Sequence, residues 1–412
     1  MKSFRELPRD AWLLLAARGI FSMLESLLLV GLMLRVEASG AGTIANAGLM
    51  IAMAIPAVVT MSWAGRVADR EDSRTILTLA IGTQIIACLV LATSLTLTPG
   101  WIMYAACLVF QAGYSFANPV WMVLIPKIVG ESRVQQVAGA QMLITSVATP
   151  AGAGLAGVLV DAAGTQAVPL AGAALLVVVG ILARTIRTRH TAEALTDQEQ
   201  QSSTTGGMGV IRRDRVLLTV LIGAMVIALV SLGVNVVEVF FVREDLGASA
   251  TQYGLTEVFF AVGTALASLI VMKLATDRNR TWAITIGFAG CAAVCVGISQ
   301  IHSFYAYAGL SVLLGLANAV VNGAVGPLFL LRTPEAQRGR VMATVNGMFS
   351  TATILALFLG GMAGAWLSPR TIFLVGGLLA LPFVAITGIF AVPSSGSSNP
   401  PTDEQSFEGP VG

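Results

Sequence analysis

The sequence has few of the residues that carry enzyme chemistry. Asp, Glu, Lys and Arg make up only 11% of its 412 residues, and it contains two histidines and four cysteines. All four cysteines lie inside apolar runs, so they offer neither a disulfide framework nor a metal-ligand spacing. A His-x-x-x-His motif is absent, as is a Gly-x-x-x-x-Gly-Lys-[Ser/Thr] phosphate loop. We therefore exclude ATP-driven and His-x-x-x-His metal chemistry, and expect no enzymatic activity, no metal and no cofactor.

Apolar residues are abundant instead. Hydrophobic residues make up 56% of the chain, and the mean hydropathy is +0.81. A bilayer core about 30 Å thick requires roughly 20 apolar residues per helix, and runs of this kind recur along the whole chain. They predict twelve transmembrane helices, at about 11–35, 43–66, 74–95, 100–124, 136–160, 166–186, 214–242, 251–274, 281–299, 303–331, 340–366 and 370–392.

The basic residues are distributed unequally between the predicted loops. With both termini placed in the cytoplasm, 20 of the 24 Lys and Arg residues lie in cytoplasmic segments. Arg35, Arg243 and Arg370 lie in outer loops, and Arg18 lies inside the first span. Because Lys and Arg are retained in cytoplasmic loops, we predict a multi-pass protein of the cell membrane with cytoplasmic N- and C-termini. The net charge of only +2 gives no support to a nucleic-acid partner.

An internal repeat relates the two halves of the chain. The pattern Arg35-x-Glu37, with Asp69-Arg70 further on, recurs 208 residues later as Arg243-x-Asp245, with Asp277-Arg278 further on. We predict an all-α membrane protein with 12 transmembrane helices in two pseudo-symmetric six-helix bundles, as in transporters whose halves rock about a midplane site. The expected divisions are an N-terminal bundle at 1–186, a cytoplasmic linker at 187–213, a C-terminal bundle at 214–392 and a disordered tail at 393–412.

The charged loop after the second span carries a family resemblance. Gly65-x-x-x-Asp69-Arg70-x-x-x-Arg74 resembles the loop between helices 2 and 3 of the major facilitator superfamily, and 273–280 is similar to its second, degenerate copy. The stretches 125–141 and 334–347 resemble the branch that contains macrolide and multidrug exporters and a siderophore exporter. This resemblance implies the major facilitator fold and a transport function. Thr149-Pro150 and the residues after them match the motif of drug antiporters only in part, which leaves antiport open.

The same charged loop predicts a gate at the cytoplasmic end. We expect Asp69 near the start of the third span, where a helix dipole favours a carboxylate, and we expect it to pair with Arg338 or Arg340 of the other bundle. Such pairs would hold the bundles together and break when that side opens. The alternative is that these charges only fix topology and solubility. The predicted inner-gate residues are Gly65, Asp69, Arg70, Arg74, Asp277, Arg278, Arg338 and Arg340.

Charged residues inside the spans are functional candidates, because an ionised side chain at a helix centre costs about 2.5–3.5 kcal/mol. A carboxyl group there can be neutral when buried and ionised when it faces water, which suits a proton carrier. The charged candidates have structural alternatives: Glu25 could pair with Arg18, and Glu238 with Arg243. Glu257 could stabilise a helix end, and the long Arg18 side chain could snorkel inward. The proton-coupling or substrate-binding candidates are Glu25, Glu257, Glu238, Arg18 and Asn235.

Uncharged polar residues follow one face of each of two predicted helices. Such stripes suit the wall of a cavity, although asparagines also hydrogen-bond between membrane helices for about 0.6 kcal/mol each. The cavity-lining candidates are Gln111, Ser115, Asn118, Met122, Asn318 and Asn322.

These features together predict a secondary active transporter. We expect proton-coupled efflux of amphipathic organic compounds such as drugs, macrolides or siderophore-like molecules, and hence a contribution to antibiotic resistance. The alternatives are an importer or a lysophospholipid or metabolite transporter of the same superfamily, and a membrane receptor or scaffold without transport. The expected partners are a small-molecule substrate, protons and the lipid bilayer, and we expect a monomer.

Overall fold

The structure is a computed structural model that describes residues 7–93, 100–130, 133–186, 207–272, 274 and 276–391. The side chains of 61–66, 68–70, 277, 336, 390 and 391 are outside this description, as are the predicted tail and residues 187–206 of the predicted linker. The first six helices are α1 (Arg9–Ala38), α2 (Gly42–Arg70), α3 (Ser73–Thr93), α4 (Trp101–Val129), α5 (Val134–Ala163) and α6 (Ala167–Thr185). They form the N half.

The second half follows a short helix, α7 (Gly207–Arg213). It contains α8 (Arg215–Phe240) with a π-helical extension at Phe241–Asp245, α9 (Ala250–Val271), α10 (Asp277–Gln300), α11 (Phe304–Arg332), α12 (Arg338–Trp366) and α13 (Pro369–Ile386) with a π-helical end at Thr387–Ala391. These elements form the C half. The described residues contain twelve helices long and apolar enough to cross a membrane, which confirms the predicted fold class.

Local sequence signals place the helix ends. Asp214 caps α8 by accepting from the backbone N–H groups of the second and third helical residues, and Ser249 and Gln252 form a capping box at the start of α9. Gly130 and Gly164 follow α4 and α5 with φ of 72° and 80°, a conformation that glycine adopts without a Cβ clash.

The two halves pack their helices in the same way. In the N half α1 packs on α5 and α6, α2 on α4, and α3 on α4 and α6; in the C half α8 packs on α12 and α13, α9 on α11, and α10 on α11 and α13. The first residues of α2 and α9, Gly42 and Ala250, are 208 residues apart, as the repeat predicts. The halves touch each other through α5 with α9 and α2 with α12.

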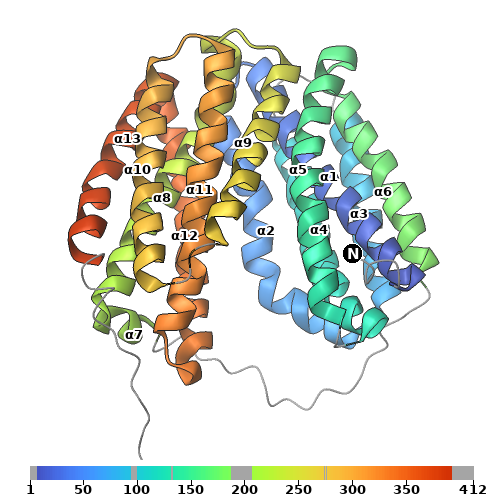
Figure 1. Cartoon of the computed structure of the whole chain (residues 1–412). Coiled ribbons are helices and arrows are strands. Elements are labelled where there is room, and N and C mark those ends of the chain that lie inside the picture. The colour runs from blue at the N-terminus through green and yellow to red at the C-terminus, as the bar shows by residue number, and fades with distance from the viewer. Residues whose placement is uncertain are drawn as a thin grey trace, which may run out of the picture.

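The halves meet at one end of the molecule and separate toward the other, where α7 lies (Figure 1). We call the meeting end the outer end, because the basic residues predict that it faces away from the cytoplasm. Here Gly157 of α5 lies against α9, since a Cβ on Gly157 would be 2.2 Å from the Ala250 carbonyl oxygen. Gly254 of α9 is equally close to α5, 2.4 Å from the Ala153 carbonyl oxygen by the same measure. Small residues thus let the two backbones touch.

Two local expectations are corrected by the structure. Asp69 lies in the last turn of α2, not at the start of the third span, because α2 runs without a break through Gly65 to Arg70. That end of a helix carries negative partial charge and does not favour a carboxylate. In addition, the last seven residues of the predicted linker form the helix α7, whose Ile211 is fully buried.

Candidate functional site

A cavity of about 450 Å³ lies within the C half. Its wall is formed by all six long helices of that half, with aromatic residues and a set of polar side chains. The polar or charged side chains are Ser231, Asn235, Glu238, Thr256, Glu257, Tyr307, Ser311, Asn318 and Asn322. This volume is within the range of pockets that bind small organic molecules.

Glu238 is held by a hydrogen bond inside this cavity. The Tyr307 hydroxyl donates to Glu238 Oε1 at 2.6 Å, and Tyr307 is only 2% exposed. Tyr253 of α9 is also buried, and its hydroxyl contacts Met33 Sδ of the N half at 3.8 Å. Since Tyr307 belongs to α11 and Glu238 to α8, this bond ties two helices of the cavity wall together.

Glu257 enters the same cavity from α9 and is only partly exposed. Within the described part of the chain, no hydrogen bond or ion pair is recorded for its carboxyl group. No Lys, Arg or His belongs to the residues that the structure places on the cavity wall. Glu238 and Glu257 therefore share one cavity, and no described residue on its wall is basic.

The charged residues of the N half are arranged differently. Arg18, only 6% exposed, donates from Nη1 to Asn118 Oδ1 at 2.7 Å. With the Gln141 amide turned so that its oxygen faces Arg18, this oxygen accepts from Nη2 at 2.9 Å and from Nε at 3.2 Å. Arg18 thus uses its hydrogen bonds to join α1 to α4 and α5, and does not snorkel to the membrane surface.

Glu25 lies near Arg18 and interacts with α4. Its carboxyl group lies near the Tyr114 and Gln111 side chains, and it attracts the Arg18 charge through space. The Tyr114 ring stacks on Phe21 with 5.0 Å between ring centroids. Glu25 therefore has a cation nearby, whereas the described wall of the C-half cavity offers none to Glu238 and Glu257.

The other predicted cavity residues have varied surroundings. Asn322 donates from Nδ2 to Asn318 Oδ1 at 2.7 Å along the cavity wall. In α4, Ser115 donates to the Gln111 carbonyl oxygen of its own helix. Met122 is 51% exposed. The structure thus brings Asn318 and Asn322 together with Asn235, Glu238 and Glu257, and brings Gln111 and Asn118 together with Glu25 and Arg18.

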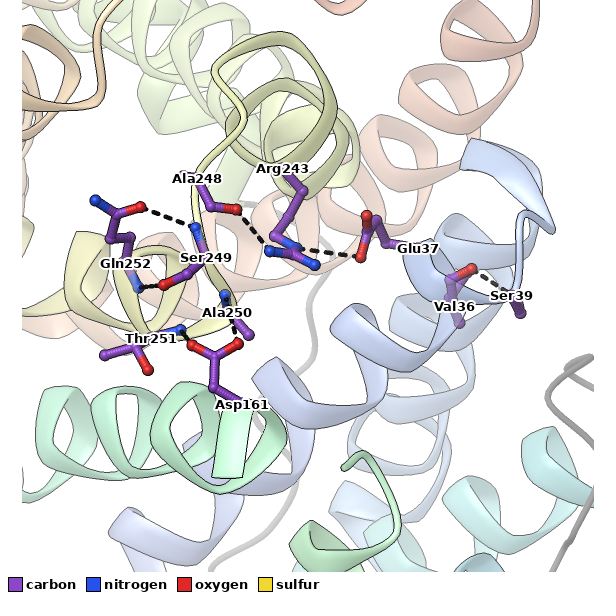
Figure 2. Close-up of polar contacts among 10 residues, drawn as sticks. All are labelled: Val36, Glu37, Ser39, Asp161, Arg243, Ala248, Ser249, Ala250, Thr251 and Gln252. Atoms are coloured by element: carbon purple, nitrogen blue, oxygen red, sulfur yellow. Dashed lines mark hydrogen bonds and ion pairs between the residues drawn. The ribbon is translucent and has the colours of Figure 1, made fainter. Parts of the chain in front are cut away.

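At the outer end, a carboxylate of one half binds the start of a helix in the other half. Asp161 of α5 accepts from the backbone N–H of Ala250 at 3.2 Å and of Thr251 at 2.7 Å (Figure 2). These are the first two residues of α9, whose N–H groups have no partner within the helix. Because Ser249 already accepts from Gln252 N–H, Asp161 satisfies the donors that the capping box leaves.

Three more contacts cross between the halves at this end. Arg243 pairs with Glu37, with 3.3 Å between Nε and Oε2 (Figure 2). Thr43 donates to the Gly361 carbonyl oxygen at 3.1 Å, and the fully buried Asn46 donates to the Val236 carbonyl oxygen at 2.7 Å. Arg243 thus pairs with the N half, rather than with Glu238 as the alternative interpretation has it. We call these contacts, with that of Asp161, the outer gate.

At the opposite end, the predicted inner-gate arginines bind within their own halves. Arg74 donates from Nη2 to the Ile186 carbonyl oxygen at 2.9 Å, which joins α3 to the end of α6. Arg338 pairs with Glu335 at 3.1 Å and donates to the Leu330 carbonyl oxygen at 2.9 Å. Arg278 and Arg340 are exposed. The side chains of Asp69, Arg70 and Asp277, and the surroundings of Gly65, lie outside the described residues.

The comparison with known families decides the family. The model described as the Major Facilitator Superfamily matches residues 1–153, 112–242 and 220–410. The chain belongs to the major facilitator superfamily. This is a family of membrane transporters and not a class of enzymes, and it confirms the resemblance drawn from the charged loop.

Relatives from the superfamily cover most of the chain at low identity. A transporter of the superfamily from Bacillus subtilis (strain 168) is 25% identical over 82% of this chain and 82% of its own. Macrolide efflux protein A of Streptococcus pyogenes is 21% identical over 77% of this chain and 80% of its own length. Macrolide efflux protein A of Enterococcus faecalis is 21% identical over 71% of this chain and 93% of its own length.

Solved structures show the same superfamily fold. A bacterial homologue of the iron transporter ferroportin, in an inward-facing state, superposes with a TM-score of 0.70 at 16% identity over 94% of this chain and 98% of its own. A bacterial homologue of the human lysosomal transporter Spinster, inward-facing and unoccupied, superposes with a TM-score of 0.68 at 13% identity, over 94% of this chain and 96% of its own. At these identities the similarity shows the fold alone.

Several residues of this superfamily member were not among the sequence candidates. Asp161 lies at the end of a predicted span, where a carboxylate looks like an ordinary loop residue. The sequence contains only a weak indication of its role: Gly157, one turn earlier, permits a close contact between helices. Tyr307 and Gln141 are polar residues whose partners lie on other helices. These partners are distant in the sequence, so the sequence alone does not indicate them.

Proposed function

We propose that this transporter couples the efflux of amphipathic organic compounds to proton entry, by alternating access between the two halves. One observation carries the proposal: Glu238 and Glu257 share a cavity whose described wall has no basic residue. Two carboxylates in one cavity repel, so at least one of them favours a proton when the cavity closes and water is excluded. The 21% identical macrolide efflux proteins support export and amphipathic substrates.

This proposal gives the C-half acids the main role in coupling. Glu25 has Arg18 as a nearby cation, which offsets part of the cost of burying its charge. Glu257 has no recorded partner among the described residues, so a proton or a substrate is needed to compensate its charge. We therefore assign proton exchange to Glu257 with Glu238, and a supporting role to Glu25 with Arg18.

The outer gate supports an inward-facing state. The contacts of Asp161, Glu37 and Asn46 hold the halves together at the outer end, and Arg74 and Arg338 at the other end bind within their own halves. Rocking the halves would break the outer gate and bring the inner-gate residues together, with Asp69 as a candidate partner for Arg338 or Arg340.

Efflux from cells tests the proposal. Cells that lack their major drug exporters and express the chain should expel preloaded ethidium or erythromycin, and a protonophore should stop this expulsion. Glu257→Gln should abolish energy-dependent efflux, because an amide cannot exchange the proton. The matched control is Glu244→Gln, which neutralises an exposed acid of the outer end and should leave efflux intact. Full efflux by Glu257→Gln would refute the assignment.

A further inference from the structure

A groove of about 290 Å³ lies between α3 and α6 of the N half, apart from the C-half cavity. Its volume is just below the range of about 300–1,000 Å³ of pockets that hold small organic molecules. Most of its wall is apolar, with Ile81 and Ile85 from α3 and Leu176 and Ile181 from α6. The groove is therefore shaped by two neighbouring membrane helices rather than by the interface between the halves.

The outer side of this groove faces lipid. The helix α6 lies on the side of the N half away from the C half (Figure 1). Val177 is 48% exposed and Ile181 is 58% exposed, and both belong to an apolar span that is long enough to cross a membrane. In a bilayer such side chains meet acyl chains rather than water, so an occupant of this part of the groove must be apolar.

The length of the groove matches one leaflet of the membrane. From Arg74 to Ile85 the helix α3 rises by roughly 16 Å at 1.5 Å per residue, and half of a hydrocarbon core is about 15 Å. Arg74 lies at the end opposite the outer gate, which the basic residues predict to face the cytoplasm. The groove thus extends over the cytoplasmic leaflet.

Two arginines line the groove at this end. Arg74 donates from Nη2 to the carbonyl oxygens of Ile186 at 2.9 Å and Arg184 at 3.4 Å. Within the described chain, no hydrogen bond or ion pair is recorded for Arg74 Nη1 or for the exposed guanidinium group of Arg184. No Asp or Glu belongs to the described wall. Because guanidinium groups bind phosphate through paired N–H donors, this end suits a phosphate.

The repeat of the fold does not require this pair of arginines. The helix α13 packs in the C half as α6 does in the N half. Its one basic residue in Pro369–Ile386 is Arg370, which lies at the outer end and pairs with Asp245. A basic end of the groove is therefore a feature of the N half.

We infer that an anionic phospholipid of the cytoplasmic leaflet binds in this groove, with its phosphate against Arg74 and Arg184 and an acyl chain along the apolar wall. Basic pockets between membrane helices on the cytoplasmic side bind anionic headgroups, and the exposed apolar wall accounts for the chain. The lipid bridges α3 and α6. This site is separate from the C-half cavity, so the inference does not depend on the proposed function.

Native mass spectrometry of the purified full-length protein tests the charged end. Phosphatidylglycerol should bind more tightly than phosphatidylcholine with the same acyl chains. Arg184→Gln should weaken phosphatidylglycerol binding by about fivefold, the contribution of one basic residue near an anionic lipid. Arg184→Lys keeps the charge and should bind like the unchanged protein, which separates loss of charge from misfolding. The matched control is Arg215→Gln, which neutralises an exposed arginine of the C half and should leave binding unchanged.

A second variant tests the apolar wall. Gly82 lines the groove, and a Cβ added to it would have no atom within 4 Å. Gly82→Leu should therefore fill the groove without disturbing the helices, and should weaken phosphatidylglycerol binding at least fivefold. Gly309→Leu adds the same side chain to α11 at a glycine with equally open surroundings, and should bind the lipid like the unchanged protein.

Four results would overturn the inference. They are equal binding of the two lipids, unchanged phosphatidylglycerol binding by Gly82→Leu, an equal loss in Arg184→Gln and Arg215→Gln, and displacement of phosphatidylglycerol by an equal concentration of inorganic phosphate. The last result would show an anion site that needs no acyl chain. Retention of phosphatidylglycerol in the presence of phosphate, with losses confined to Arg184→Gln and Gly82→Leu, would support the lipid site.

Discussion

The outer gate makes a quantitative prediction about Asp161. This carboxylate lies in the last turn of α5, where the helix dipole disfavours it, and at the start of α9, where the dipole favours it. Only the closed outer end provides the favourable contact. Replacing Asp161 by Ala should therefore shift the molecule toward the state that is open at the outer end.

The magnitude follows from two hydrogen bonds to one charged acceptor. Such bonds contribute about 1.5–3 kcal/mol each when buried, and exposed charge contacts contribute less. Since Asp161 is exposed, we take about 1–2 kcal/mol for both bonds together. A change of 1.4 kcal/mol is about tenfold in an equilibrium constant, so the ratio of outer-open to outer-closed molecules should rise by about tenfold.

Spin labels across the outer end would measure this ratio. Ala163 at the end of α5 and Trp366 at the end of α12 are both exposed and belong to different halves. The four native cysteines are buried, so labels would attach selectively at these two positions. Asp161→Ala should enlarge the long-distance population in a pulsed electron–electron resonance experiment, and Asp161→Asn should do so less, because its amide oxygen still accepts one bond.

The control weakens the cap of the same helix at a residue that does not interact with Asp161. Gln252→Ala breaks the capping box of α9 within the C half and should leave the distance distribution close to that of the unchanged protein. An Asp161→Ala distribution identical to that of the unchanged protein would show that Asp161 does not hold the outer end closed. An equal shift in Gln252→Ala would contradict the prediction as well, since helix fraying rather than the contact with α5 would then explain the change.

Two further substitutions follow from the packing. Gly157→Leu should prevent closure of the outer end, because even a Cβ would be 2.2 Å from the Ala250 carbonyl oxygen; the same labels should report only the long distance, and transport should be lost. Asp214→Ala removes both the cap of α8 and the 2.8 Å pair with Arg332 Nε, so thermal unfolding in detergent should show a loss of about 1–3 kcal/mol, whereas Asp214→Asn, which keeps a capping side chain, should lose less.

Much of the fold could be predicted because a bilayer imposes a simple rule on the sequence. Runs of apolar residues give the helices, and their ends agree with the structure within a few residues. The expected position of Asp69 near the start of the third span is wrong for a local reason. The helix α2 continues through Gly65 to Arg70. A single glycine ends a helix only where other groups bind the last carbonyl oxygens. The helix α7 was missed because it is short and its surroundings look like a linker.

The site could be predicted only in part. Glu25, Glu238 and Glu257 are visible in the sequence because a charge inside an apolar run is costly. Their different environments are not visible, since Arg18 lies near Glu25 and Glu257 shares its cavity with Glu238 only after the helices pack. The outer gate is less predictable still. Asp161 binds backbone N–H groups of another helix, and no side-chain pattern marks such an acceptor.

The most direct test of proton-coupled exchange through this cavity is substrate-triggered proton movement. Proteoliposomes with an acidic interior and an entrapped pH dye would receive ethidium or erythromycin, one compound at a time. A transported compound should raise the interior pH faster with the unchanged protein than with Glu257→Gln, and Glu244→Gln should behave like the unchanged protein. Transport of either compound without proton movement, or equal movement with Glu257→Gln, would contradict this mechanism.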